Sequence, residues 1–143
     1  MRCGELTRMS VFVGGPRDTV AQCAQAMRRH DIGFLPIVDD EGRPLGVVTD
    51  RDLTLRVLAE GMDPMTPVAE VMSRGVAVCR LMESLDLAEE RMVAAGLTRL
   101  PVVDDGGRCV GVLSFDDIVQ AESRHRAGEL CQELTRPRVV RRR

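Results

Sequence analysis

The sequence predicts a mixed α/β fold built from two copies of one structural unit. Residues 35–53 reappear as residues 100–118, without a gap, and 10 of the 19 aligned positions are identical. Such a repeat indicates that the chain must be interpreted as two similar units. In each copy, two β-rich apolar runs flank a polar turn and precede a stretch with helical spacing. A unit of about 60 residues buries too little surface alone, so we expect the two copies to share a core.

The first copy shows the start and stop signals of its elements in order. Thr19 is a predicted helix N-cap, and Gln22 completes its capping box. The predicted elements are a strand at 10–13, a helix from Thr19 to about His30, an antiparallel hairpin with strands 35–38 and 45–48, and a helix from Asp52 to Glu60 that ends at Gly61.

The second copy follows the same plan after a linker at residues 62–67, where Thr66 and Pro67 predict a short helical turn. Its predicted elements are a strand at 76–78, a helix from the N-cap Ser84 to Gly96, hairpin strands 100–103 and 110–113, and a helix from about Asp116 that runs past His125. The equivalent residues Met27 and Met92 are expected to fill the core.

Gly46 and Gly111 occupy equivalent positions inside the second strand of each hairpin. Glycine weakens a strand interior, so its presence there predicts a bulge or a place where another segment approaches the backbone closely.

Each of these strands ends in a corner of four residues, Thr49-Asp50-Arg51-Asp52 in copy one and Ser114-Phe115-Asp116-Asp117 in copy two. A hydroxyl residue with an acid three positions later is typical of a helix capping box. The same atoms also suit an anion site, where the hydroxyl holds a phosphate and the carboxylate accepts hydrogen bonds from ribose. The local pattern leaves both interpretations open.

The two corners differ at their third position, where Arg51 in copy one is matched by Asp116 in copy two. An arginine forms charge-assisted hydrogen bonds to phosphate, whereas an aspartate repels it. We therefore expect a phosphate to bind more tightly at the corner that contains Thr49 and Asp52. The alternative is that Arg51 pairs with a nearby carboxylate such as Asp50.

The doubled pattern of apolar-Pro-apolar-Val-Asp, followed by Gly-apolar-apolar-Thr/Ser-x-x-Asp, resembles the CBS domain, which typically occurs as a tandem pair called a Bateman module. The chain is similar to stand-alone bacterial CBS-pair proteins of the hypoxic response type. The resemblance implies two β-α-β-β-α repeats packed through their sheets with pseudo-two-fold symmetry. We assign repeat 1 to residues 1–61, the linker and repeat 2 to residues 62–126, and a C-terminal extension with a basic tail to residues 127–143.

The resemblance also implies an adenosine-containing ligand, such as AMP, ADP, ATP or S-adenosylmethionine, bound in the cleft between the repeats. On this basis both corners border one shared crevice, and the residues near the ligand are Thr49, Asp52, Ser114 and Asp117 with Arg51, while strand residues Pro36, Ile37, Pro101 and Val102 lie near the base. A homodimer that signals to a separate, unknown protein is expected. No cofactor is required.

Composition narrows the possible functions. No apolar run is long enough to span a bilayer, and no signal peptide is evident, so a cytoplasmic location without membrane contact is expected. The five cysteines are scattered, which favours idle thiols over a metal site. Without Trp or Tyr, and with a net charge of -2, nucleic-acid binding is not expected, and the basic tail at 138–143 is interpreted as solvated.

Three functions compete. The leading prediction is a regulatory or sensory module that binds an adenosine ligand. The alternative is a scaffold or dimerisation module that binds no nucleotide and acts through protein–protein contacts. An enzyme is disfavoured, because the sequence shows no set of nucleophile, base and orienting group and no metal-ligand cluster.

Overall fold

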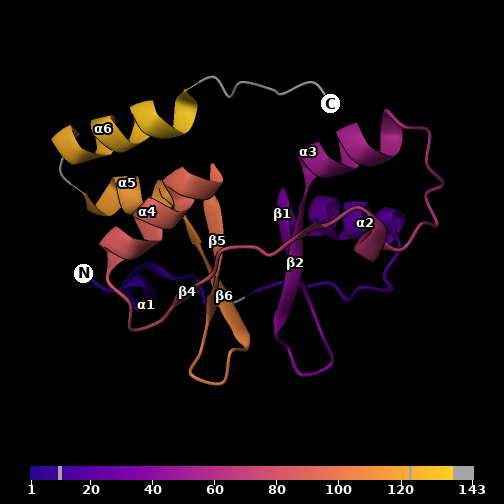
Figure 1. The fold of residues 1–143 in the computed structure, drawn as a ribbon, viewed down its shortest axis with the longest axis horizontal. Helices are drawn as coiled ribbons and strands as arrows, with labels where there is room; N and C mark the ends of the chain where they lie inside the picture. The colour runs from indigo at the N-terminus through magenta and orange to yellow at the C-terminus, as the bar shows by residue number, and fades with distance from the viewer. Residues whose placement is uncertain (10, 123, 137–143) are drawn as a thin grey trace.

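The computed structural model describes residues 1–9, 11–122 and 124–136. It contains two three-stranded sheets, one in each repeat, that lie side by side at the centre of the molecule with helices on their outer sides (Figure 1). The predicted α/β fold of two repeats is therefore confirmed. The basic tail at 138–143 lies outside the described residues.

The first sheet, β1-β2-β3, is built on the hairpin of repeat 1, and its third strand comes from residues 62–126, which the sequence assigned to the linker and repeat 2. The elements of this half are α2 (Val20–His30), β1 (Phe34–Val38), β2 (Pro44–Thr49), α3 (Asp50–Asp52), the π-helix η1 (Leu53–Leu58), the 3-10 helix η2 (Val68–Glu70) and β3 (Ser73–Arg74). Thr19 caps α2 in a capping box with Gln22, as predicted. The helix predicted after Asp52 is present, but Leu53–Leu58 has the wider π geometry, and η2 begins one residue later than predicted.

Repeat 2 forms the sheet β4-β5-β6. Its elements are β4 (Cys79–Arg80), α4 (Leu85–Ala95), β5 (Arg99–Val103), β6 (Cys109–Ser114), α5 (Phe115–Ala121) and α6 (Arg124–Thr135), and the N-terminal helix α1 (Cys3–Leu6) packs beside β4. The helix predicted to run past His125 ends at Ala121, because the backbone of Glu122 is extended. The proposed boundary between residues 126 and 127 falls inside α6.

The predicted strands at 10–13 and 76–78 are wrong for the described residues. Residues 11–13 and 76–78 have no strand structure, and pairing begins one residue later, at Gly14 and at Cys79. The third strand of the first sheet is instead β3, which pairs with β2 beside Gly46. In the second sheet, Arg8 of the N-terminal segment pairs with Val112 next to Gly111. These strand pairings depend on backbone hydrogen bonds between distant segments. The apolar character of residues 10–13 and 76–78 therefore did not predict them.

Gly46 and Gly111 are the places of close backbone approach that the sequence predicted. A Cβ atom on Gly46 would lie 2.4 Å from the carbonyl oxygen of Ser73, and one on Gly111 would lie 2.5 Å from that of Arg8. Since both obstacles are backbone atoms, no side-chain rotation can relieve the clash.

The core consists of two hydrophobic clusters, one in each repeat, and not of the single shared core that was expected. One cluster surrounds Ile37 and Val48, and the other surrounds Leu100 and Ile118. The second cluster also includes Cys3 of α1 and Leu130 of α6. Met27 and Met92 are buried in their respective clusters, as predicted.

Helix α6 is fixed to α4 by a charged cluster as well as by Leu130. Arg126 contacts Asp86 at 2.8 Å, Glu89 at 2.5 Å and Glu122 at 3.3 Å. The side chain of Glu89 is only 8% exposed, and its Oε1 atom has no hydrogen-bond partner among the described residues. This carboxylate is therefore buried with only half of its acceptor capacity satisfied.

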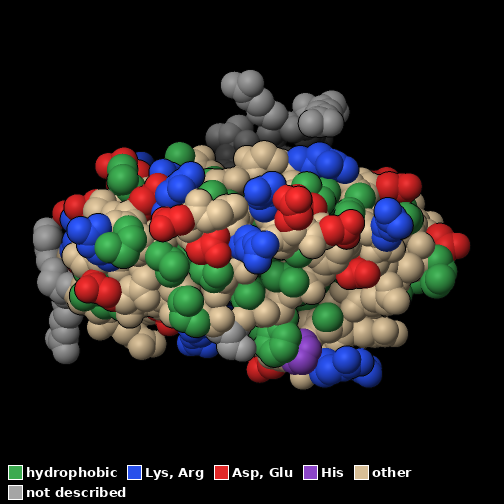
Figure 2. All heavy atoms as spheres, turned by 90° about the horizontal axis from the view of Figure 1, so that it is seen from below, with side chains coloured by type: hydrophobic (Ala, Val, Ile, Leu, Met, Phe, Trp, Pro, Cys, Tyr) green, Lys and Arg blue, Asp and Glu red, His purple; other side chains and the backbone are tan. Residues whose placement is uncertain are grey.

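The described surface mixes both signs of charge. On the face shown in Figure 2, arginines and acidic side chains are interspersed with apolar ones, and no extended basic stripe crosses this part of the molecule. Among the described residues, no helix has the length and apolar character that crossing a membrane would need.

The close approach at Gly46 gives a first prediction. Gly46→Ala should destabilise the fold by about 1–3 kcal/mol, because the added Cβ overlaps the Ser73 backbone. Gly128→Ala is the control, since nothing lies within 4 Å of a Cβ there and alanine favours a helix by about 1 kcal/mol over glycine. Urea denaturation measures both variants. A Gly46→Ala protein as stable as the wild type would show that β3 does not dock at this glycine.

Glu89 gives a second, pH-dependent prediction. Burial raises the pKa of Glu89 more than its contact with Arg126 lowers it, and Asp86 and Glu122 raise it further. The same contact raises the pKa of Arg126, but this guanidinium is 44% exposed, so the burial of Glu89 sets the sign. A group whose pKa is raised on folding destabilises the fold as the pH rises through its folded pKa.

Glu89→Gln should therefore increase the free energy of unfolding more at pH 7 than at pH 4, where the carboxyl group is mostly protonated in both the folded and the unfolded state. Urea denaturation at the two pH values provides the measurement. Glu90→Gln, on the exposed side of the same helix, is the matched control and should show no such difference. If Glu89→Gln were more destabilising at pH 7 than at pH 4, the ion pair with Arg126 would outweigh the cost of burial.

Candidate ligand-binding clefts

Both corners form the helix caps that the sequence predicted. Thr49 Oγ1 accepts a hydrogen bond from the backbone N–H of Asp52 at 3.1 Å, and Asp52 Oδ2 accepts one from the N–H of Thr49 at 2.9 Å. In repeat 2, Ser114 Oγ accepts from the N–H of Asp117 at 3.2 Å and donates to Asp117 Oδ2 at 2.6 Å. The capping interpretation is confirmed, and the second oxygen of each carboxylate lies 3.5 Å from an arginine, Arg56 for Asp52 and Arg8 for Asp117.

The two corners open into two different clefts, which corrects the expectation of one shared crevice. The first, named here the Thr49 cleft, has a volume of about 610 Å³ and is bordered by residues 49–52, 73–77 and 95–99. The second, the Ser114 cleft, has a volume of about 400 Å³ and is bordered by Arg8, Val11 and Phe12, by residues 30–34 and by the Ser114 corner. Each corner faces the other repeat, at the segment that leads into its hairpin. The pseudo-symmetry of the repeats therefore produces two sites, and Gly33, Phe34 and Arg99 line both.

The Thr49 cleft carries an excess of positive charge. Arg51, Arg56, Arg74 and Arg99 line it together with two acids, Asp50 and Asp52. Arg56 is held in place because it donates to the carbonyl oxygen of Val71 at 2.7 Å and lies 3.5 Å from Asp52 Oδ1. Arg74 donates to the carbonyl oxygen of Ala69 at 3.1 Å. This arrangement suits an anionic group such as a phosphate.

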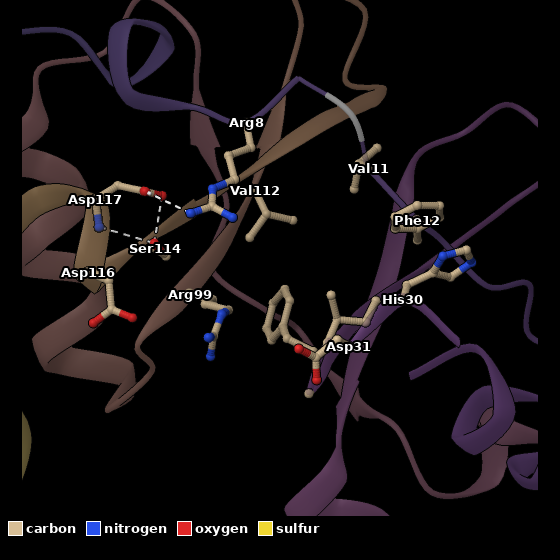
Figure 3. A pocket seen from close by; sticks show the side chains of 13 residues that line it. Arg8, Val11, Phe12, His30, Asp31, Arg99, Val112, Ser114, Asp116 and Asp117 are labelled. Carbon is tan, nitrogen blue, oxygen red and sulfur yellow. Dashed lines mark hydrogen bonds and ion pairs between the residues drawn. The ribbon is translucent and has the colours of Figure 1, made fainter. Parts of the chain in front are cut away.

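The Ser114 cleft carries an excess of acids. Asp31, Asp116 and Asp117 line it with Arg8 and Arg99, and Arg8 lies 3.5 Å from Asp117 Oδ1 (Figure 3). Its far wall is apolar and aromatic, where the rings of Phe12 and His30 stack with centroids 3.5 Å apart. This cleft suits a neutral or cationic group better than a phosphate.

The predicted site residues divide into three groups. Thr49, Arg51 and Asp52 line the Thr49 cleft, and Ser114 and Asp117 line the Ser114 cleft. The strand residues Pro36, Ile37, Pro101 and Val102 are fully buried in the sheets and line neither cleft. On the two strands that carry them, β1 and β5, the residues that border the clefts are Phe34 and Arg99, at the start of each strand.

The Arg51 guanidinium is exposed, and among the described residues no carboxylate oxygen lies within 4 Å of it. Its backbone N–H, not its side chain, contacts Asp50, at 2.9 Å. The predicted alternative of a side-chain ion pair with Asp50 is therefore absent from this structure.

Sequence reasoning missed most of the charged residues in the clefts. Arg8 and Arg74 enter them on the extended segments that dock beside Gly111 and Gly46. Arg56 lies one helical turn after Asp52, so a search for basic residues near the corner would have found it. His30 was interpreted as a cap or surface residue, and it both ends α2 and borders the Ser114 cleft.

The cysteines lie away from the clefts. Cys3, Cys23 and Cys79 are buried, and burial raises the pKa of Cys23 to about 11, so this group is a neutral thiol at neutral pH. In the part of the chain that the structure describes, no group of three or more His, Cys, Asp or Glu side chains is arranged to hold a metal ion.

The sequence of this chain matches the family model of the CBS domain twice, at residues 4–59 and 68–124. The chain belongs to the CBS domain family. Hypoxic response protein 1 of Mycobacterium tuberculosis is 34% identical over 141 residues, which cover 95% of both chains. An uncharacterised protein of Methanopyrus kandleri, MK0525, is 37% identical over 120 residues, which cover 83% of this chain and 61% of that protein.

Solved CBS-pair structures share this fold. The structure of Hypoxic Response Protein I with two coordinated zinc ions is similar with a TM-score of 0.79 and 31% identity, covering 86% of this chain and all of that one. The CBS pair of MJ0100 in complex with 5-methylthioadenosine and S-adenosyl-L-methionine has a TM-score of 0.77 and 26% identity, covering 85% and 98%. CBSX2 in complex with AMP has a TM-score of 0.70 and 25% identity, covering 84% and 94%. CBS pairs of this shape therefore include proteins that bind adenosine ligands.

Proposed function

We propose that this protein is a regulatory CBS pair that binds a phosphorylated adenosine ligand in its Thr49 cleft. The observation that carries the proposal is the arginine-lined wall around the Thr49–Asp52 corner. The candidate ligands are AMP, ADP and ATP, and S-adenosylmethionine is the candidate for the more acidic Ser114 cleft. Binding without catalysis, at a cytoplasmic location, is part of this proposal.

The roles of the residues follow from their chemistry. Arg51 is exposed, so it can turn toward a phosphate, while Arg56 and Arg74 are held at the cleft wall by hydrogen bonds to backbone carbonyls. Thr49 can donate its hydroxyl proton to a phosphate oxygen, because the cap uses that oxygen only as an acceptor. Asp52 Oδ1, which lies 3.5 Å from Arg56, can also accept hydrogen bonds from ribose hydroxyls, because a carboxylate oxygen has more than one acceptor position.

The difference in charge between the clefts supports the ranking predicted from Arg51 and Asp116. The Thr49 cleft has four arginines and two acids, whereas the Ser114 cleft has two arginines and three acids. We therefore propose that a phosphate binds the first cleft more tightly than the second.

The alternative function, a scaffold that binds no nucleotide, is favoured by one observation. The capping hydrogen bonds of Thr49 and Asp52, and those of Ser114 and Asp117, are complete without any ligand. These residue types are therefore explained by the stability of the fold alone.

Ligand titration separates the two functions. AMP at 100 times its Kd should stabilise the wild type by about 2.7 kcal/mol in thermal or urea unfolding. Asp52→Ala should weaken AMP binding by roughly 10-fold or more, whereas Asp117→Ala should change it little, since a hydrogen bond to a charged group contributes about 1.5–3 kcal/mol. Calorimetry measures the affinities.

Both substitutions remove a cap residue, so each variant is the stability control for the other. An equal loss in the two variants, or a larger loss in Asp117→Ala, would contradict the ranking. No stabilisation by AMP, ADP, ATP or S-adenosylmethionine would favour the scaffold.

We further propose that the protein is a homodimer that contacts its copy through repeat 1. An apolar groove of about 400 Å³ runs between α2 and η1, bordered by Ala24, Val57 and Leu58, with Leu58 77% exposed. The equivalent face of repeat 2 is covered by α6 and its buried Leu130. Because the two faces are related by the repeat, the uncovered one is the natural place for a second chain.

Sedimentation tests the dimer. The wild type should sediment at about twice 15.8 kDa, and Leu58→Glu should shift it toward the monomer because a charge replaces an apolar contact. Met82→Glu is the matched control, since Met82 is 64% exposed on the other repeat. A wild type that sediments only as a 15.8 kDa species would rule out the homodimer.

In this proposal the signal from the bound ligand passes to a separate protein. A ligand that binds one conformation of the pair better than another shifts the population toward that conformation, and a partner can detect the difference.

A further inference from the structure

Arg99 occupies a position shared by both clefts. It is the first residue of β5, it lies opposite Ser114 across the β5–β6 ladder, and it lines the Thr49 cleft as well as the Ser114 cleft. Figure 3 shows its side chain in the Ser114 cleft, between Asp116 on one side and Asp31 on the other. The equivalent residue of repeat 1 is Phe34, which lies opposite Thr49 and is buried. Of two symmetric positions between the clefts, only one therefore carries a charge.

The guanidinium of Arg99 is not committed to a carboxylate. Among the described residues, none has a carboxylate oxygen within 4 Å of it, whereas Arg8 lies 3.5 Å from Asp117 and Arg56 lies 3.5 Å from Asp52. Arg99 is partly exposed, and an arginine side chain has several rotatable bonds. It is therefore the charge on this wall that can respond to what the clefts contain.

The charge balance of the Ser114 cleft depends on Arg99. With Arg99 turned into this cleft, two arginines face Asp31, Asp116 and Asp117. With Arg99 turned away, only Arg8 remains against the three carboxylates. The cleft then becomes markedly more negative, and such a change is felt over several ångströms in a partly buried site.

We propose that Arg99 couples the two clefts electrostatically. A phosphate in the Thr49 cleft attracts the guanidinium of Arg99 and removes it from the carboxylates of the Ser114 cleft. The Ser114 cleft then binds a cationic ligand more tightly and an anionic one less tightly. Because coupling between two sites is reciprocal, the cation strengthens phosphate binding by the same factor. This inference rests on the proposed function, since it requires that a ligand enters each cleft.

The test measures the binding of S-adenosylmethionine, which carries a sulfonium cation, with and without saturating AMP. Calorimetry on the wild type should show at least a 5-fold lower Kd for S-adenosylmethionine when AMP is present, within the usual range of coupling between sites. The Kd of AMP should fall by the same factor when S-adenosylmethionine is present. The neutral probe 5-methylthioadenosine should show little change.

Two substitutions of Arg99 remove the proposed link. In Arg99→Met and in Arg99→Gln, AMP should leave the Kd of S-adenosylmethionine almost unchanged. Unfolding curves verify that both proteins are folded. Arg51→Gln is the matched control, because Arg51 lines only the Thr49 cleft of these two. Arg51→Gln should raise the Kd of AMP. At saturating AMP, however, the Kd of S-adenosylmethionine should still fall by the same factor as in the wild type. Asp117→Ala should raise the Kd of S-adenosylmethionine, which would assign this ligand to the Ser114 cleft.

The outcomes are distinct. If both ligands bind with affinities independent of each other, or if the factor survives in Arg99→Met and Arg99→Gln, the coupling by Arg99 is wrong while the proposed function stands. If neither AMP nor S-adenosylmethionine binds, the proposed function fails and the coupling fails with it.

Discussion

The architecture depends on two glycines at which the backbone of another segment packs against a strand. At Gly46 the segment is β3, and at Gly111 it is the N-terminal segment around Arg8. Any side chain at either position would overlap a backbone carbonyl. These two contacts complete the sheets, and they also bring Arg74 into one cleft and Arg8 into the other. The fold and the charge of the clefts thus depend on the same close approach.

Duplication gives the protein two equivalent halves, and single substitutions between them give each half its own chemistry. Arg51 is matched by Asp116, and Phe34 is matched by Arg99, so one cleft is basic and the other acidic although their backbones are alike. On the outer surface, Ala24 is matched by Glu89. Alanine leaves an open apolar groove in repeat 1, whereas Glu89 contacts Arg126 of α6, the helix that covers this face of repeat 2. The pair is therefore symmetric in its fold and asymmetric in its surfaces.

The corner residues show why a motif alone does not determine a function. The hydrogen bonds of Thr49 and Asp52 stabilise the start of a helix whether or not a ligand is present. What distinguishes the Thr49 cleft from an ordinary capped helix is the group of arginines around it. Only one of them, Arg51, belongs to the four-residue corner, and the others come from η1, β3 and β5.

The sequence by itself determined the repeat, the hairpins, the caps at Thr19, Thr49 and Ser114, and the close approach at Gly46 and Gly111, because these features depend on local chemistry and on comparison of the two copies. Only the tertiary structure decided that Ser73–Arg74 and Arg8 complete the sheets, that α6 covers repeat 2, and that the corners open into two clefts with different charges. These outcomes depend on contacts between residues far apart in the chain. The short segments that make them, such as the two residues of β3, have no pattern of their own that would predict their partners.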